Sequence, residues 1–159
     1  EDPVAAARAL VGAGIPLGSV HAAAALRAPV ADSQTRARLS KFVEPRYLHQ
    51  TVAGAGGRQI RRYRDLPEYL AASAAEPAAD EVRVHFHVPL DAATVGGLAT
   101  TAPLTLAALR AILSEGATDK VIAETYTFGS GPLDDPVDLA DALARELRWL
   151  IEGLGLTLA

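Results

Sequence analysis

The sequence predicts a protein of the α/β class. Segments with helical periodicity alternate with short apolar segments rich in β-branched residues, and no repeat of fixed period is present. This alternation is typical of a largely parallel sheet covered by helices. Four strand signals, at Leu17, Tyr47, Val82 and Val121, are compatible with two architectures. One is a small open parallel α/β sheet, and the other is part of a closed eight-stranded barrel, which usually needs about 250 residues.

The helices are predicted from their caps and their apolar periodicity. Asp2 can cap the first helix, Pro3 suits its first turn, and Gly12 ends it. Asp32 or Ser33 begins the second helix. The other helices are expected at 66–75, at 105–114 and from 135–136 onward.

One segment, 47–64, departs from the alternation. Residues 47–53 and 59–63 are predicted to be strands, and the glycines between 54 and 57 form the turn that joins them. We therefore expect an inserted β-hairpin. The rest of the chain, residues 1–159, is expected to be a single domain or a fragment of one.

Composition excludes several classes of protein. The 159 residues carry a net charge of −4 and include no cysteine, which excludes disulfides, thiolate nucleophiles and Cys-ligated zinc. The longest apolar runs are shorter than the roughly 18 residues of a membrane span, and no leader peptide stands at Glu1, so we expect a cytoplasmic protein. Methionine is also absent, and Glu1 is too bulky for ready removal of an initiator before it. We expect a fragment or a processed product.

Basic residues cluster at the predicted hairpin, where Arg58, Arg61, Arg62 and Arg64 surround Tyr63. Such a cluster can bind nucleic acid, but the chain as a whole is acidic. We interpret the cluster as a solvated face or as an interface with missing chain. The expected ligand is a small molecule, and no nucleic-acid partner is expected.

All four histidines, His21, His49, His85 and His87, lie within or at the end of predicted strands. Because side chains alternate along a strand, His85 and His87 project to the same face. Two imidazoles are costly to bury in an apolar core without hydrogen-bond partners. The pair is therefore expected either to line a cavity or to be satisfied as core or edge histidines.

A carboxylate in the last predicted strand is the second candidate functional group. Glu124 lies in an otherwise apolar segment, so it is expected to be paired, protonated or bound to a cation. The structural alternative is an ion pair with an arginine of a neighbouring strand. His21 ends another strand and Arg27 follows six residues later on a loop. An imidazole can ligate a metal there, and a guanidinium can grip a substrate hydroxyl or phosphate.

Three motifs resemble a known family. They are Glu44-Pro-Arg-Tyr-Leu-His49-Gln50, Arg83-Val-His85-Phe-His87-Val-Pro89 and Glu124-Thr-Tyr-Thr-Phe128. In this order they resemble the carboxyl-terminal half of the Ebo-type metabolite-traffic proteins (EboE), members of the xylose isomerase-like TIM-barrel superfamily. The resemblance implies the C-terminal half of a (β/α)8 TIM barrel with an inserted β-hairpin. The strands at Leu17, Val82 and Val121 would be its last three.

The resemblance also implies a metal site. The superfamily binds one divalent metal, commonly Mn²⁺, Mg²⁺, Co²⁺ or Zn²⁺, and on its pattern His21 and Glu124 would be ligands. The other ligands would belong to the missing N-terminal half. Arg27 matches an arginine that contacts substrate in the related sugar epimerases.

We therefore predict a metal-dependent isomerase or epimerase that acts on a sugar or polyol-like metabolite. Glu124, His85 and His87 would be catalytic, and Arg27 and His49 would bind substrate. The alternative is a non-catalytic protein that binds a metabolite in an export or biosynthetic pathway. The missing N-terminal half, or a second copy of the chain, would cover the strand edges and helix faces that half a barrel leaves open.

Overall fold

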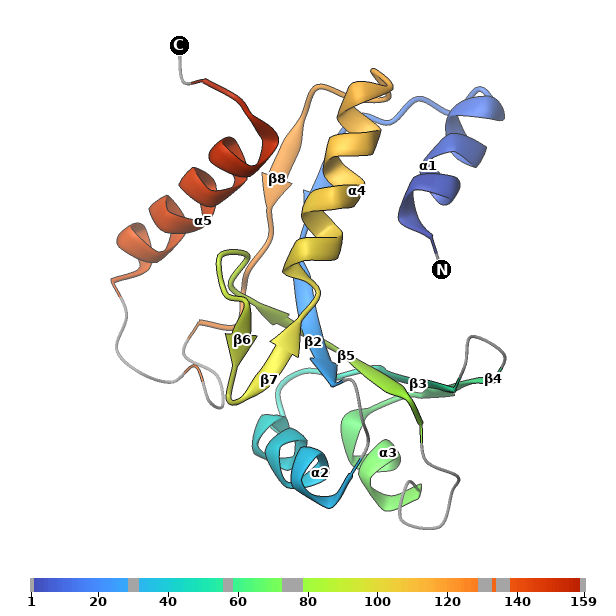
Figure 1. Cartoon of the computed structure of the whole chain (residues 1–159), viewed down its shortest axis with the longest axis vertical. Coiled ribbons are helices and arrows are strands. Elements are labelled where there is room, and N and C mark those ends of the chain that lie inside the picture. The colour runs from blue at the N-terminus through green and yellow to red at the C-terminus, as the bar shows by residue number, and fades with distance from the viewer. Residues whose placement is uncertain are drawn as a thin grey trace.

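The computed structural model describes residues 2–28, 32–55, 59–72, 79–128, 133 and 138–157. Its helices are α1 (Pro3–Gly12), α2 (Ser33–Leu39), α3 (Leu66–Ala72), α4 (Ala102–Ser114) and α5 (Leu139–Leu154), with a short 3-10 helix, η1 (Ser40–Phe42). Its strands are β1 (Val20–Ala22), β2 (Ala24–Ala28), β3 (Thr51–Ala55), β4 (Gln59–Tyr63), β5 (Glu81–Val88), β6 (Thr94–Val95), β7 (Leu98–Thr100) and β8 (Val121–Ala123). The α/β class is confirmed (Figure 1).

The strands form one large antiparallel sheet and one small parallel pair. The large sheet has the order β4-β3-β5-β2-β7-β6, and each neighbouring pair in it is antiparallel. β1 pairs with β8 in parallel, with His21 opposite Ile122. The prediction of a largely parallel sheet is therefore wrong, and the described residues form no closed barrel.

The direction of β5 explains this difference. β5 runs antiparallel to β2, with Arg27 opposite Arg83, whereas neighbouring strands of a TIM barrel are parallel. On its other edge β5 pairs with β3, which brings Thr51 opposite Val84. The hairpin expected at 47–64 is present as β3 and β4, although residues 56–58 of its turn lie outside the described residues. Because both edges of β5 have antiparallel partners, the half-barrel arrangement is not confirmed.

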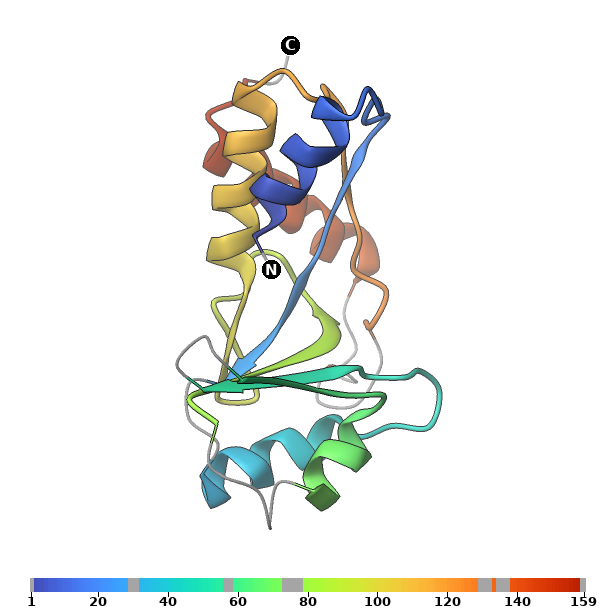
Figure 2. The same ribbon diagram turned by 90° about the vertical axis from the view of Figure 1, so that its right-hand side faces the viewer.

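β1 and β2 follow one another as an almost continuous extended segment (Figure 2). Ala22, Ala24, Leu26 and Ala28 are buried along one side of it. Alanine is depleted in strands, so the sequence pattern indicated a loop at Arg27, and this expectation is wrong. The segment is extended despite the low strand propensity of alanine, because this conformation buries its small side chains on one face.

Much of the hydrophobic core lies between the large sheet and the helices on one side of it, and the same core also includes Leu109 of α4 and Leu150 of α5. In Figure 2, α2 and α3 lie on that side, whereas α1, α4 and α5 lie on the other with β1 and β8. The fully buried core residues of α2, η1 and α3 are Leu39, Phe42, Leu66 and Tyr69, and those of β5 are Val82, Val84, Phe86 and Val88. Because strand side chains alternate, the burial of these positions leaves Arg83 and His85 on the opposite face.

Aspartates cap three of the helices. Oδ1 of Asp2 accepts a hydrogen bond from the backbone N–H of Val4 at 2.9 Å, and Oδ1 of Asp32 accepts one from Thr35 at 2.6 Å. These contacts confirm the two N-termini expected from the sequence. Helix α5 is capped by Asp138, while residues 134–137, where its start was expected, lie outside the described residues.

Two helices expose large apolar side chains at the surface. Leu10 and Val11 of α1 and Leu139 and Leu147 of α5 are 42% to 55% exposed. Among the described helices, none has the length and apolar character that a membrane span needs.

Two glycines form the tight turn between β6 and β7. Gly96 and Gly97 have φ angles of 56° and 75°, as a two-residue hairpin turn requires. A Cβ atom at position 96 would lie 2.9 Å from Cζ of Phe42, which is fully buried. The turn therefore needs glycine at 96 both for its backbone conformation and for its approach to the core.

Gly96→Ala is expected to lower the free energy of unfolding by about 2–3 kcal/mol. Roughly 1 kcal/mol comes from placing alanine at positive φ, and the rest comes from displacing the Phe42 ring. Denaturation by urea measures the loss. Gly97→Ala is the matched control, because its Cβ would meet the Arg38 side chain at 3.3 Å, and it should lose about 1 kcal/mol. Equal losses in the two variants would contradict a clash with Phe42.

Candidate functional site

β5 presents two histidines on the face opposite the core. The Nε2 atoms of His85 and His87 lie 2.9 Å apart, and their ring centroids lie 4.9 Å apart. His85 is exposed, whereas His87 is buried. The shared face that the two-residue spacing predicts is confirmed.

The other ring nitrogens of this pair face oxygen atoms. Nδ1 of His87 lies 2.9 Å from the backbone oxygen of Glu124, and Nδ1 of His85 lies 3.1 Å from Oε1 of Gln50. Burial is the largest influence on His87 and lowers its pKa below the ordinary value, although the hydrogen bond to Glu124 acts in the opposite direction. His87 is thus favoured as a neutral imidazole.

The parallel pair β1 and β8 brings His21 beside Glu124. Nδ1 of His21 lies 3.2 Å from Oε2 of Glu124, and the backbone N–H of Glu124 donates to the oxygen of Ala22 at 2.8 Å. The two side chains are 55% and 42% exposed. Of the states expected for Glu124, the structure therefore has a pair, and its partner is an imidazole rather than an arginine of a neighbouring strand.

We use the term histidine face for His21, His85, His87 and Glu124. These four residues come from β1, from β5 and from the residue that directly follows β8. They are linked through the contacts described above, because Glu124 touches His21 with its carboxylate and His87 with its carbonyl. The histidine face unites four of the six residues that the sequence indicated as functional.

Arg27 lies elsewhere. Its guanidinium forms a 2.5 Å ion pair with Glu81, which also accepts a 2.6 Å hydrogen bond from Arg83. Burial would raise the pKa of Glu81, but the hydrogen bonds from the two arginines outweigh it and hold the pKa below the usual range. Six residues of extended chain separate Arg27 from His21, a span of roughly 20 Å. The structure does not bring Arg27 to the histidine face.

His49 is fully enclosed. Its Nε2 lies 2.9 Å from Oε1 of Glu44, and its Nδ1 lies 3.2 Å from the backbone oxygen of His85. Its ring packs on Phe86 with centroids 4.7 Å apart, on the core side of β5. Both ring nitrogens are engaged and only 1% of the residue is exposed, so these contacts describe a satisfied core histidine.

Two tyrosines border the histidine face, and the sequence reasoning missed them. The Tyr126 ring lies 4.4 Å from that of His87 and 5.3 Å from that of Tyr47, measured between centroids. Burial raises the pKa of the Tyr126 phenol, and the charge of Glu124 raises it further. The available signal was the position of Tyr126, two residues after Glu124, which gives it the same side of an extended chain.

A buried carboxylate, Glu146 of α5, was also missed. Its Oε1 accepts hydrogen bonds from the backbone N–H of Leu90 and from the hydroxyl of Thr125, both at 2.6 Å. Its Oε2 is buried and has no hydrogen-bond partner among the described residues. The sequence clue was its position, because Ala142, Glu146 and Leu150 follow one another at intervals of four residues and so share one face of the helix. In the structure all three are buried.

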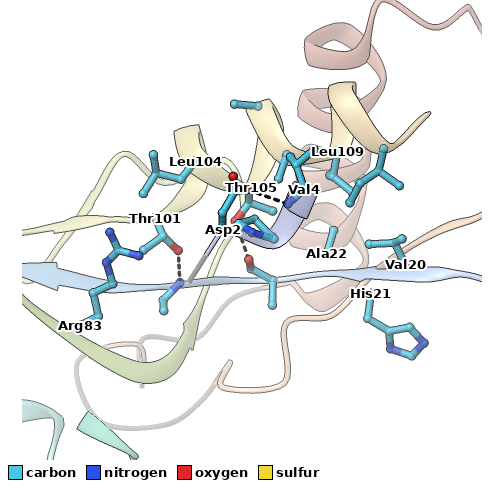
Figure 3. Close-up of a pocket in the computed structure, with 16 residues that line it drawn as sticks. Asp2, Val4, Val20, His21, Ala22, Arg83, Thr101, Leu104, Thr105 and Leu109 are labelled. Atoms are coloured by element: carbon cyan, nitrogen blue, oxygen red, sulfur yellow. Dashed lines mark hydrogen bonds between the residues drawn. The ribbon is translucent and has the colours of Figure 1, made fainter. Parts of the chain in front are cut away.

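An apolar groove lies on the other side of β1. It encloses about 740 Å³ between α1, α4 and β1, and Val20, Ala22, Leu104 and Leu109 contribute to its lining. Figure 3 shows the His21 ring directed away from these helices. The His21 ring therefore points away from the groove, although His21 is among the residues that line it.

The donors of His21 and Glu124 suit a divalent cation, because imidazole and carboxylate are common metal ligands. They provide two ligands. Within the part of the chain that the structure describes, no group of three or more histidine, aspartate or glutamate side chains could hold a metal ion. A complete site at this position would need further ligands.

Comparisons of the chain with models of known families, with curated proteins and with solved structures found no match.

Proposed function

We propose that this chain is part of a xylose isomerase-like enzyme that isomerises or epimerises a sugar or polyol-like metabolite at the histidine face. The observation that carries the proposal is the continuous series of contacts from His21 through Glu124 to His87 and His85. In this series the Glu124 carboxylate contacts the imidazole of His21, and the backbone oxygen of Glu124 contacts that of His87. Carboxylates and imidazoles can both exchange protons with a substrate when suitably placed. Proton transfer at a carbon beside a carbonyl is the step that such reactions share.

Each residue has a role in this proposal. The Glu124 carboxylate is the base, because it is exposed and can reach a bound substrate. His21 orients that carboxylate from 3.2 Å, and the imidazoles of His85 and His87 hold or return the proton. Substrate binding by Arg27 and His49 is not part of this reacting centre, since the first pairs with Glu81 and the second is buried.

A divalent metal such as Mn²⁺, Mg²⁺, Co²⁺ or Zn²⁺ fits the donor set of His21 and Glu124. When bound, the metal would polarise substrate oxygens as a Lewis acid. Its remaining ligands would come from a barrel half outside this chain, as the resemblance to the Ebo-type proteins implies. The pairing of this chain with a second barrel half is part of the same proposal.

Replacement of His21 or Glu124 by alanine in the full-length protein tests the proposal. Each variant should lose its bound divalent metal, and turnover should fall by about 10²- to 10⁴-fold, the usual range for loss of a general base. Elemental analysis of the purified protein measures the metal. Glu152→Ala on α5, which removes an exposed carboxylate away from the histidine face, is the control and should keep both properties. Unchanged metal content in the His21 and Glu124 variants would refute the assignment.

Metabolite binding without turnover, in an export or biosynthetic pathway, is the second candidate. Its support is the apolar groove, whose lining is mostly apolar and whose ionisable lining residues are Asp2, His21 and Arg83. A metabolite library separates the two candidates. Turnover of a ketose or sugar phosphate supports the enzyme, whereas saturable binding with no product supports the binding protein.

A further inference from the structure

The groove between α1, α4 and β1 has the size and the lining of a small-molecule site. Most of its lining is apolar, with alanines on both the helix side and the strand side. The part contributed by α4 runs from Thr101 to Ile112, a length of roughly 16 Å along a helix. Its volume of about 740 Å³ falls within the range of ligand pockets, roughly 300–1,000 Å³. The groove therefore suits a ligand with an elongated apolar body.

Two of the three ionisable residues in this lining are already engaged. Oδ1 of Asp2 accepts hydrogen bonds from the backbone N–H groups of Val4 and Ala5, so this carboxylate lies against the positive end of the α1 dipole. The His21 ring is directed away from the groove and lies beside Glu124 (Figure 3). The third ionisable residue therefore decides which charge the groove offers to a ligand.

Arg83 is this third residue, and its neighbours leave a positive charge in excess. Its Nε donates to Oε1 of Glu81 at 2.6 Å, while the guanidinium of Arg27 lies 2.5 Å from Oε2 of the same carboxylate. One carboxylate is thus shared between two guanidiniums. A guanidinium has five N–H donors, and this bond of Arg83 uses one of them. Because its side chain is 46% exposed, Arg83 is accessible to a ligand.

The positive charge lies at one end of the groove. Figure 3 shows Arg83 beside Thr101 and Leu104, where α4 begins. The side chain of Thr101 forms no cap bond with α4, and its hydroxyl instead accepts the backbone N–H of Ala25 at 2.9 Å. The positive end of the α4 dipole therefore adds to the charge of Arg83. The groove combines one electropositive end with a length that is otherwise mostly apolar.

We propose that this groove binds an apolar molecule with one carboxylate, of the class of a medium-chain fatty acid, with the acid group on Arg83. A guanidinium can bind both oxygens of a carboxylate, and one carboxylate matches the single positive charge in excess. The apolar chain would lie along α4. The inference names the ligand class for the second candidate function and rests on it. It leaves the proton transfer proposed at Glu124 unaffected, because the acid group lies at Arg83.

The test uses decanoate as the probe, added to the full-length protein below the concentration at which decanoate forms micelles. Isothermal titration calorimetry measures binding, and the expected result is one decanoate per chain. Octanoate, which is two CH₂ groups shorter, should bind roughly 10-fold more weakly because it buries less apolar surface. Decylammonium, which has the same chain and the opposite charge, should show no saturable binding.

Two variants change the charge at the electropositive end. Arg83→Gln keeps a donor for Glu81 and removes the positive charge, so it should weaken decanoate binding by roughly 10- to 100-fold. Leu104→Glu adds a negative charge at a position that is 46% exposed, and it should weaken binding at least as much. Arg148→Gln on α5, outside the lining, is the matched control and should bind decanoate as the original sequence does. Circular dichroism checks that each variant is folded.

The inference is overturned if decanoate shows no saturable binding, or if both Arg83→Gln and Leu104→Glu bind it as well as the original sequence does. A protein segment or a second copy of the chain would then be the better occupant of the groove. Saturable binding of another metabolite, without binding of decanoate, would reject the ligand class and keep the second candidate function. Absence of any bound metabolite would reject both.

Discussion

Replacement of Glu146 by alanine is expected to lower the free energy of unfolding by about 3–4 kcal/mol. The carboxylate is the hydrogen-bond acceptor for the backbone N–H of Leu90 and for the hydroxyl of Thr125, and the residue is fully buried. Leaving a buried donor unsatisfied costs about 1–3 kcal/mol, and the space left by the side chain adds a cavity. Urea denaturation followed by circular dichroism measures the change.

Glu146→Gln is the matched variant for this prediction. It keeps an acceptor oxygen for Leu90 and Thr125, and it removes the charge associated with Oε2, which has no hydrogen-bond partner among the described residues. Its stability is expected to lie within about 1 kcal/mol of that of the original sequence. A glutamine variant as unstable as the alanine variant would show that the charge itself, rather than the acceptor, holds α5 against the strands.

Phe86→Ala is expected to cost about 3–5 kcal/mol, the usual range for deletion of a buried phenylalanine. The Phe86 ring is fully buried and packs edge-to-face on Phe42, with centroids 5.2 Å apart, and against the His49 ring. Phe86→Leu keeps most of the apolar volume and should lose less than about 1.5 kcal/mol. Thermal and urea unfolding give the two values, and a loss below about 1 kcal/mol in the alanine variant would contradict the packing described.

This second prediction also concerns the histidine face. Phe86 lies between His85 and His87 in β5, so the residue that anchors the strand in the core sets the position of both imidazoles. Any loosening of β5 should separate the two Nε2 atoms.

Local features of the sequence predicted much of the structure correctly. The caps Asp2 and Asp32, and the shared face of His85 and His87, follow from relations between residues a few positions apart. Such relations depend on bond geometry and on short-range hydrogen bonds, which do not depend on how distant parts of the chain are arranged. Burial of Val82, Val84 and Phe86 follows from the same alternation.

Other features could not be predicted from these patterns. The alanine-rich segment of β2 has no β-branched side chains to mark it, so Arg27 was assigned to a loop. The alternation of helices and strands favoured a parallel sheet, yet β5 pairs antiparallel with both of its neighbours. Periodicity reports which face of a strand is buried, and it contains no information on the direction of the strand beside it.

The class of the fold, the starts of α1 and α2, and the residue types capable of chemistry are properties of the amino-acid sequence, whereas α4 begins at Ala102, three residues before the start expected at 105. The contact between His21 and Glu124 joins residues 103 positions apart, and it exists because β1 and β8 lie side by side. The meeting of His87 with the Glu124 carbonyl likewise depends on where β5 ends relative to β8. Strand order results from the competition of all backbone edges and apolar faces for partners, which is a property of the whole folded chain.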